Sequence, residues 1–164
     1  MRGRGVDTRR RFRLALTVLG AIWLAATVAT PRPVNPPVDA AARIEATTDV
    51  PAAVHDVLRT ACFDCHSDET VWPWYARVFP ASWLVRQDVE EGRGQMNFSR
   101  WATYNVFDRA DMLDEACEHV REREMPLWQY RLLHAGGRLD DGQIEMLCGW
   151  TSAEAERLAG EAGP

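Results

Sequence analysis

The pentapeptide Cys62-Phe63-Asp64-Cys65-His66 decides how the rest of this chain is interpreted. Its two cysteines lie three residues apart, on one helical turn, and a histidine follows directly. Two thiols at this spacing can add to the two vinyl groups on one edge of a porphyrin, and the imidazole can then bind the iron. We therefore predict one covalently bound haem c, attached through Cys62 and Cys65, with His66 as the proximal ligand.

A Cys-x-x-Cys pair can also belong to a thiol redox site or to a zinc site. A thioredoxin-like redox site lies within alternating strand and helix patterns, and no such pattern surrounds this pair. A zinc site of this type uses a second Cys-x-x-Cys pair, whereas Cys117 and Cys148 are isolated cysteines. Covalent haem attachment is therefore the interpretation that we carry forward.

The composition indicates one domain with an acidic surface. A length of 164 residues corresponds to a single domain, and 46% hydrophobic residues are enough for a core. The net charge of -5 is unevenly distributed, because residues 1–30 hold six of the 19 basic residues and only one of the 24 acids. The acidic remainder argues against nucleic acid as a partner. It favours redox partner proteins with a basic docking surface.

Residues 1–30 have the pattern of a signal peptide or membrane anchor. Four arginines between positions 9 and 13 form a basic flank, and residues 14–30 carry no charge. A run of this length is at the short end of what spans a bilayer, and slightly long for a signal-peptide core. Thr27-Val28-Ala29 offers a small-x-small cleavage site, so retention and removal both stay open. The basic flank predicts that everything after residue 30 lies outside the cytoplasm.

The rest of the chain is expected to form three further segments. Residues 31–48 begin with four prolines in seven residues, which predicts a stiff, extended spacer that would hold the domain off the membrane. Residues 49–150 contain the periodic apolar patterns and are predicted to form the haem domain. Residues 151–164 are predicted to be a flexible tail.

Helical periodicity is found on both sides of the Cys-x-x-Cys-His motif. Apolar residues recur at i, i+3, i+4 and i+7 after Pro51, which predicts a helix of about ten residues that delivers Cys62 from its last turn. A second helix is predicted from Pro80 to about Glu91, with Gly92 as its C-terminal stop.

Two more helices are predicted towards the C-terminus. Asp108 is expected to cap the first, and the second is expected to run from Asp140 to about Trp150. Each carries one cysteine on its apolar side, Cys117 and Cys148 respectively. In an oxidising compartment the two can form a disulfide, and two buried free thiols are the alternative. The predicted fold class is all-α, with one hydrophobic N-terminal helix ahead of the helical domain.

One methionine is well placed to bind the haem iron from the other side. Met125 precedes Pro126, which prevents the residue before it from continuing a helix, so the Met125 thioether can point at a metal. Met112 and Met146 lie within predicted helices, and Met96 lies in a loop soon after the motif. We therefore predict Met125 as the distal ligand.

The seven tryptophans in this small chain need an explanation. A large, flat, hydrophobic cofactor in an apolar pocket provides one, and an ordinary aromatic core is the alternative. Trp72 and Trp74 follow the motif closely, and their indole N–H groups could donate to haem propionates. Both are therefore included among the predicted cofactor-binding residues.

Together these motifs resemble the arrangement found in a known class of proteins. A helix that ends in Cys-x-x-Cys-His, a later Met-Pro loop and a closing helix are similar to the class I cytochromes c. More narrowly, the chain resembles the bacterial haem-binding domain family of membrane-anchored, cytochrome c-like monohaem proteins. The resemblance covers about residues 31–150 and rests on Asn35-Pro36-Pro37-Val38, Cys62-Phe63-Asp64-Cys65-His66-Ser67, Trp72-Pro73-Trp74-Tyr75, Asn97-Phe98-Ser99-Arg100-Trp101 and Glu124-Met125-Pro126-Leu127.

The resemblance implies a cytochrome c-like helical fold around one covalent haem c on Cys62 and Cys65. It also implies His66 as the proximal iron ligand and Met125 as the distal one. It supplies no physiological partner, and it does not explain the other two cysteines.

These expectations lead to functions of different classes. If His66 and Met125 fill both axial positions, the iron has no open site for a substrate, and the transfer of single electrons is the expected function. The alternative is a haem-based sensor or small peroxidase with a weak or open distal site, where His119 or His134 would act. A non-catalytic assembly or haem-delivery module is a third. We expect an electron carrier more than an enzyme.

The expected location is the bacterial envelope. Residues 14–30 would hold the chain in the inner membrane, with the haem domain in the periplasm or outside the cell. Cleavage near Ala29 would instead release the domain into the periplasm.

Overall fold

The computed structural model describes residues 4–161, and every regular element in this range is a helix. This confirms the predicted all-α class. The chain divides into two compact units, one formed by the residues up to Val34 with Trp72–Gln87, and one formed by Asn35–Val71 with the residues from Asp88 on.

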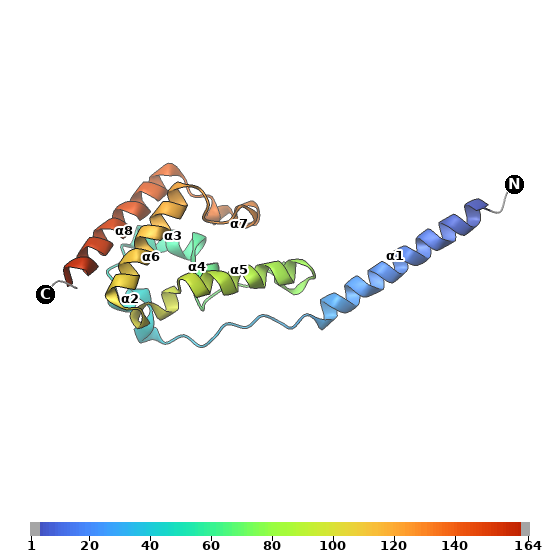
Figure 1. The fold of residues 1–164 in the computed structure, drawn as a ribbon, viewed down its shortest axis with the longest axis horizontal. Helices are drawn as coiled ribbons and strands as arrows, with labels where there is room; N and C mark the ends of the chain where they lie inside the picture. Colours follow the sequence, from blue (N-terminus) through green and yellow to red (C-terminus); the bar gives the residue numbers. More distant parts are fainter. Residues whose placement is uncertain (1–3, 162–164) are drawn as a thin grey trace. The chain divides into compact units, whose positions relative to one another are not determined.

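The first unit contains the predicted apolar N-terminal helix. α1 (Arg4–Ala29) is a continuous helix of 26 residues (Figure 1). Its segment Thr8–Ala29 is long and apolar enough to cross a membrane, with a mean hydropathy of 1.8. A signal sequence has the same properties, so the helix is a possible span or a signal. The unit also contains η2 (Trp74–Arg77) and the beginning of α5 (Ala81–Gln95).

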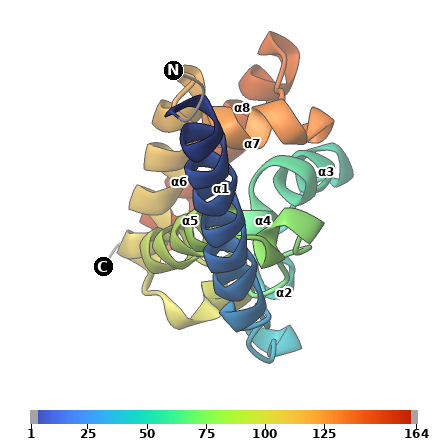
Figure 2. The same ribbon diagram turned by 90° about the vertical axis from the view of Figure 1, so that its right-hand side faces the viewer.

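The second unit is a bundle of short helices around two long ones. In chain order it contains η1 (Ala40–Ala42), α2 (Ile44–Thr47), α3 (Ala52–Ala61), α4 (Phe63–His66), the end of α5, η3 (Phe98–Thr103), α6 (Val106–Arg121), α7 (Trp128–Leu133), η4 (Ala135–Gly137) and α8 (Asp141–Glu161). The long helices α6 and α8 pack side by side (Figure 1). The short helix α7 lies near α3 (Figure 2).

The core of the second unit lies between α6, α8 and the shorter helices. Leu113 and Leu147 are almost completely buried in it. Cys117 and Cys148 form a disulfide with their Cα atoms 5.0 Å apart, so the predicted bridge is confirmed and the alternative of two free thiols is not. The bridge therefore joins α6 to α8 within the core.

The helix before the motif has the predicted form. α3 begins after Pro51, which is its N-cap, and ends at Ala61. Its inward side consists of the four residues of the apolar periodicity, namely Val54, Val57, Leu58 and Ala61, all of which are buried. The periodic pattern therefore predicted both the helix and its buried face.

The second predicted helix has a different C-terminal end. α5 continues to Gln95, so the prediction of Gly92 as its stop was wrong. A glycine that ends a helix adopts a positive φ, and none of the described glycines does. Gly92 is instead a buried position inside α5, and its packing against the motif accounts for the glycine.

The prediction of the N-cap was wrong for α6 and right for α8. Asn105, and not the predicted Asp108, caps α6, and its Oδ1 accepts from the N–H groups of Phe107 and Asp108 at 3.0 and 2.9 Å. Asn and Asp are comparable N-caps, and α6 begins after the earlier of the two, so Asp108 lies in its first turn. Asp140 caps α8 as predicted, with a reciprocal pair of bonds to Gln143.

Two segments that were predicted to lack regular structure are partly helical. Residues 31–48 include η1 and α2, and Ile44 of α2 is completely buried. α8 continues past Trp150 to Glu161, and it buries Thr151, Ala155 and Leu158. The apolar spacing of three to four residues persists beyond Trp150, which explains why the helix does not end there.

Candidate functional site

The Cys-x-x-Cys-His motif forms a separate helical turn directly after α3. Cys62 has φ -120° and ψ -42°, which separates α3 from α4, and α4 then carries Cys65 and His66. The buried Ser67 hydroxyl donates to the carbonyl of Phe63 at 2.7 Å. This bond ends the turn immediately after His66, so the two cysteines and the histidine are held on one short element.

The two thiols of the motif are not bonded to each other. Burial raises the pKa of Cys62 to about 12, and the neighbouring Cys65 adds to this shift. Burial also raises the pKa of Cys65 to about 12, helped by the carboxylates of Asp64 and Asp88 and opposed by Arg93. Both thiols are therefore protonated at neutral pH. A thiol redox site needs a lowered pKa, so this environment argues against that interpretation.

The imidazole of His66 is oriented by a backbone carbonyl. Its Nδ1 lies 3.2 Å from the oxygen of Met96, and since a carbonyl can only accept, Nδ1 is the donor. Burial lowers the pKa of His66 and outweighs the carbonyls of Met96 and Gly92, which raise it. The neutral ring therefore carries its proton on Nδ1, and the lone pair on Nε2 is available to a metal.

A buried carboxylate holds the segment that supplies this carbonyl. Asp68, only 2% exposed, accepts from Asn97 Nδ2 at 3.0 Å and from Arg100 Nε at 2.8 Å. The N–H of Asp68 donates to Ser99 Oγ at 3.1 Å. The polar residues around η3 therefore fasten the segment after Met96 to the residues that follow the motif.

Two close contacts complete the support of the motif. A Cβ atom at Gly92 would lie only 2.8 Å from the carbonyl oxygen of Cys65, so α5 can pass this close only because Gly92 has no side chain. The ring of Phe98 stacks on the ring of Phe63, with centroids 5.1 Å apart. α5 and η3 are thus packed directly on α4.

Arg93 connects the start of the second unit to the segment after the motif. Its Nε donates to the carbonyl of Ser67 at 2.8 Å. Its Nη2 donates to Asn35 Oδ1 and to Thr70 Oγ1, each at 2.9 Å. Asn35 in turn donates from Nδ2 to the carbonyl of Thr70. The chain is therefore fixed beside the motif from Asn35 onward.

Met125 lies on the loop that follows α6. The chain turns at Arg123, whose φ of 61° is in the left-handed region, and the N–H of Met125 then donates to the carbonyl of His119 at 3.1 Å. The guanidinium of Arg123 donates to the carbonyl of Leu139 at 2.7 Å and to the carboxylate of Asp141. The loop is thus attached at its start to the beginning of α8.

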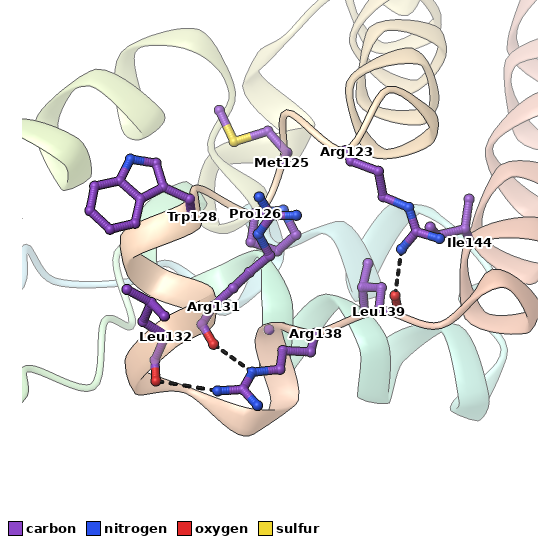
Figure 3. A pocket seen from close by; sticks show the side chains of 10 residues that line it. Arg123, Met125, Pro126, Trp128, Arg131, Leu132, Arg138, Leu139 and Ile144 are labelled. Carbon is purple, nitrogen blue, oxygen red and sulfur yellow. Dashed lines mark hydrogen bonds between the residues drawn. The ribbon is translucent and has the colours of Figure 1, made fainter.

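A cavity of about 400 Å³ lies beside this loop. In Figure 3 the side chains of Met125 and Trp128 extend from the ribbon on the side away from Ile144. The cavity combines apolar groups with three arginines, and its lining residues are Arg123, Met125, Pro126, Trp128, Arg131, Leu132, Gly137, Arg138, Leu139 and Ile144.

The helix α7, directly after the Met125 loop, exposes several large apolar side chains. Trp128, Leu132 and Leu133 are each about two thirds exposed, and Met125 is 36% exposed. Met125, Trp128 and Leu132 line the same cavity, and apolar side chains in a cavity suit a large apolar ligand. Tyr130 of the same helix bonds instead to the motif, because its hydroxyl lies 2.8 Å from Asp64 Oδ2.

The remaining predicted residues are two tryptophans and two histidines. Trp72 and Trp74 belong to the first unit, and their contact with a cofactor stays a prediction. Trp74 is about three quarters exposed, and its ring lies edge-on to Tyr75. His119 pairs with Glu124 at 2.8 Å, and the ring of His134 stacks on that of Tyr130. Both histidines are therefore already engaged within the second unit.

The donor set of the motif fits covalent haem. It offers two unlinked thiols on one turn and an imidazole whose Nε2 is free to bind iron. The apolar side chains of Met125, Trp128 and Leu132, which line one cavity, offer the kind of surface that a porphyrin face requires. Cys62, Cys65 and His66 would thus hold the group, with Met125 as the candidate for the opposite side.

Three contributors to the site were not predicted from the sequence. The carbonyl of Met96 orients His66, Gly92 admits α5, and Tyr130 bonds to Asp64. Only Gly92 has a local signal, since a glycine inside a helix costs about 1 kcal/mol and usually has a packing reason. A backbone carbonyl and a distant tyrosine hydroxyl have no comparable signature.

Comparison with known proteins gave one match. A family model described as a haem-binding domain matches residues 21–153. Neither the comparison with curated proteins nor the comparison with solved structures gave a match.

Proposed function

Because this chain belongs to the haem-binding domain family, we propose that it is a monohaem c-type cytochrome of the bacterial envelope. It would carry single electrons through a haem that Cys62 and Cys65 attach and that His66 and Met125 ligate. One-electron chemistry is what such a haem supplies when it is bound.

The bond between His66 and Met96 is the observation that carries this proposal. A histidine that ligates a metal usually donates its other ring N–H to a carbonyl or carboxylate, which fixes the tautomer and the ring orientation. His66 makes this bond from Nδ1. His66 also follows directly after Cys62 and Cys65 in the sequence. The thiols of these two cysteines are protonated, and they would react to form the thioether bonds to the haem.

The surrounding residues support a rigid attachment. The ion pair and hydrogen bonds of Asp68 and the close contact at Gly92 keep the Met96 carbonyl in place. A proximal histidine held in this way would keep the same orientation in both oxidation states of the haem. The structure would then rearrange little when an electron is transferred, which suits an electron carrier.

Haem staining after denaturing electrophoresis tests the covalent attachment. The wild-type chain should give a stained band at its own mass, and the double variant Cys62→Ala, Cys65→Ala should give none. The double variant Cys117→Ala, Cys148→Ala is the matched control, because it also removes two cysteines but should keep the stain. Complete extraction of the haem from the wild-type chain by acid acetone would exclude the proposal.

The sensor or peroxidase alternative needs an open or weakly held distal position. It would also need a polar distal group, but His119 is paired with Glu124 and His134 is stacked on Tyr130. This engagement favours the electron carrier. The rate of carbon monoxide binding by the reduced protein separates the two functions, because an open site binds it quickly and a filled site slowly.

The proposed location and partners rest on the charge pattern. α1 would hold the chain in the inner membrane, or direct it to the periplasm if it is removed, with the haem domain outside the cytoplasm. The acidic surface favours basic redox partners. Since three arginines line the cavity beside Met125, a basic partner would dock away from that cavity.

A further inference from the structure

Tyr130 links the helix after the Met125 loop to the haem-attachment turn. Its hydroxyl donates to Asp64 Oδ2 at 2.8 Å and also lies 3.1 Å from the carbonyl oxygen of Thr60. Tyr130 and Asp64 are 66 residues apart in sequence. Asp64 lies between Cys62 and Cys65, so this hydrogen bond reaches the motif itself.

The ring of Tyr130 has close neighbours in the segment that follows it. It stacks on the ring of His134 with centroids 4.0 Å apart and nearly parallel planes. A Cβ at Gly137 would lie 2.6 Å from a carbon of the tyrosine ring, and one at Gly136 would lie 2.9 Å from Thr60 Cβ. These two glycines let η4 close tightly over the ring and over α3, so the position of the hydroxyl is well defined.

The Tyr130 hydroxyl is also held in its protonated, donating form. Burial raises its pKa, and the neighbouring Asp64 raises it further. The carboxylate of Asp64 has a second donor, the N–H of Val71 at 2.8 Å to its other oxygen. Asp64 is therefore oriented as an acceptor for the tyrosine, and the pair forms a charge-assisted hydrogen bond.

Only the four residues 126–129 separate Met125 from Tyr130. A displacement of α7 from the motif would therefore move Met125 relative to His66. We propose that Tyr130 is a positioning residue whose bond to Asp64 fixes the distance between the Met125 thioether and the haem iron. This inference rests on the proposed function, in which Met125 is the distal ligand.

Loss of the hydroxyl should allow α7 to separate from the motif more often. A hydrogen bond to a charged group stabilises by an amount that corresponds to a factor of about ten or more in an equilibrium constant. The fraction of molecules with Met125 detached should rise by about that factor. Carbon monoxide reaches the iron only in those molecules, so its binding rate should rise about tenfold in parallel.

The test uses the full haem-loaded chain and the variant Tyr130→Phe. We expect retained covalent haem, a weaker far-red sulfur-to-iron band in the oxidised protein, a lower reduction potential and about tenfold faster carbon monoxide binding. Thr151→Val is the matched control, because it removes a buried hydroxyl that donates within α8 instead, to the carbonyl of Cys148 at 3.1 Å. It should leave all three readouts unchanged.

A purely structural role of Tyr130 would lower the melting temperature without changing these readouts well below it. Unchanged band, potential and carbon monoxide rate in Tyr130→Phe would therefore overturn the inference while leaving the proposed function intact. A wild-type protein without the far-red band would instead overturn the proposed function, and the inference with it. Asp64→Asn provides a second test of the same bond. In a protein that already carries Asp64→Asn, Tyr130→Phe should change the three readouts less than it does in the wild-type chain.

Discussion

Two glycines of α5 allow one substitution to be tested in two environments. Gly92 and Gly94 lie in the same helix, but a Cβ at Gly92 would meet the carbonyl oxygen of Cys65 at 2.8 Å and its Cβ at 3.1 Å. Nothing lies within 4 Å of a Cβ at Gly94. Alanine at the two positions should therefore change stability in opposite directions.

The expected magnitudes follow from two opposing effects. Replacement of a helical glycine by alanine stabilises by up to about 1 kcal/mol, since the unfolded chain loses conformational freedom. At Gly94 this gain is unopposed. At Gly92 the backbone atoms of Cys65 cannot move aside as a flexible side chain could, and overpacking of this kind costs about 1–3 kcal/mol. With the gain of about 1 kcal/mol set against this cost, we expect Gly92→Ala to be destabilising by up to about 2 kcal/mol.

Urea unfolding of the two haem-loaded variants measures both changes. Gly92→Ala should also move α5 away from α4 and so disturb the carbonyl of Met96 that orients His66, which should shift the reduction potential. Gly94→Ala should leave the potential unchanged. Equal stabilisation by both alanines, with an unchanged potential, would refute the close packing of α5 on the motif.

Three further predictions concern the loop, the bridge and the N-terminus. Arg123→Gly should be about 1 kcal/mol more stable than Arg123→Ala in urea unfolding, since both lose the guanidinium bonds but only alanine strains the left-handed backbone; equal stabilities would contradict it. Loss of the Cys117–Cys148 bridge, which spans 31 residues, should lower the free energy of unfolding by about 3.5 kcal/mol; an intact mass after alkylation of the denatured chain that is the same with and without reductant would show that no bridge forms. A C-terminal alkaline phosphatase fusion should be active in a bacterial host, and an inactive fusion would refute the orientation.

Helices with a clear apolar stripe were predictable because their signal is local. The four buried residues of α3 repeat within ten positions, and the cap of α8 is formed by Asp140 and Gln143 only three residues apart. The disulfide was predictable for a related reason. Cys117 and Cys148 each fall on an apolar stripe, so two packed helices bring them together.

Features that depend on distant contacts were predicted wrongly or not at all. Gly92 follows a polar stretch of helix, and this pattern looks the same for a helix stop and for a close approach to another segment. Only the contact with Cys65 decides between them. Residues 31–48 were predicted as a spacer from their prolines, but Asn35 is bonded to Arg93 and Thr70, and no local pattern announces these partners.

The chemistry of the site shows the same division. The spacing of Cys62, Cys65 and His66 is a sequence property and predicts the type of cofactor. The orientation of the imidazole depends on a carbonyl of Met96, and every residue has a carbonyl, so the sequence carries no mark of it. The bond from Tyr130 to Asp64 joins residues that are 66 positions apart, so it could be found only in the folded structure.

The ligation of the iron by Met125 is the central claim, and the visible spectrum of the oxidised, haem-loaded chain tests it most directly. Ligation by a thioether predicts a weak sulfur-to-iron charge-transfer band in the far red. Met125→Ala should lose this band while it keeps the covalent haem, and it should show a lower reduction potential and rapid carbon monoxide binding. A wild-type chain that lacks the band and binds carbon monoxide as fast as Met125→Ala would contradict the account and support the sensor or peroxidase function.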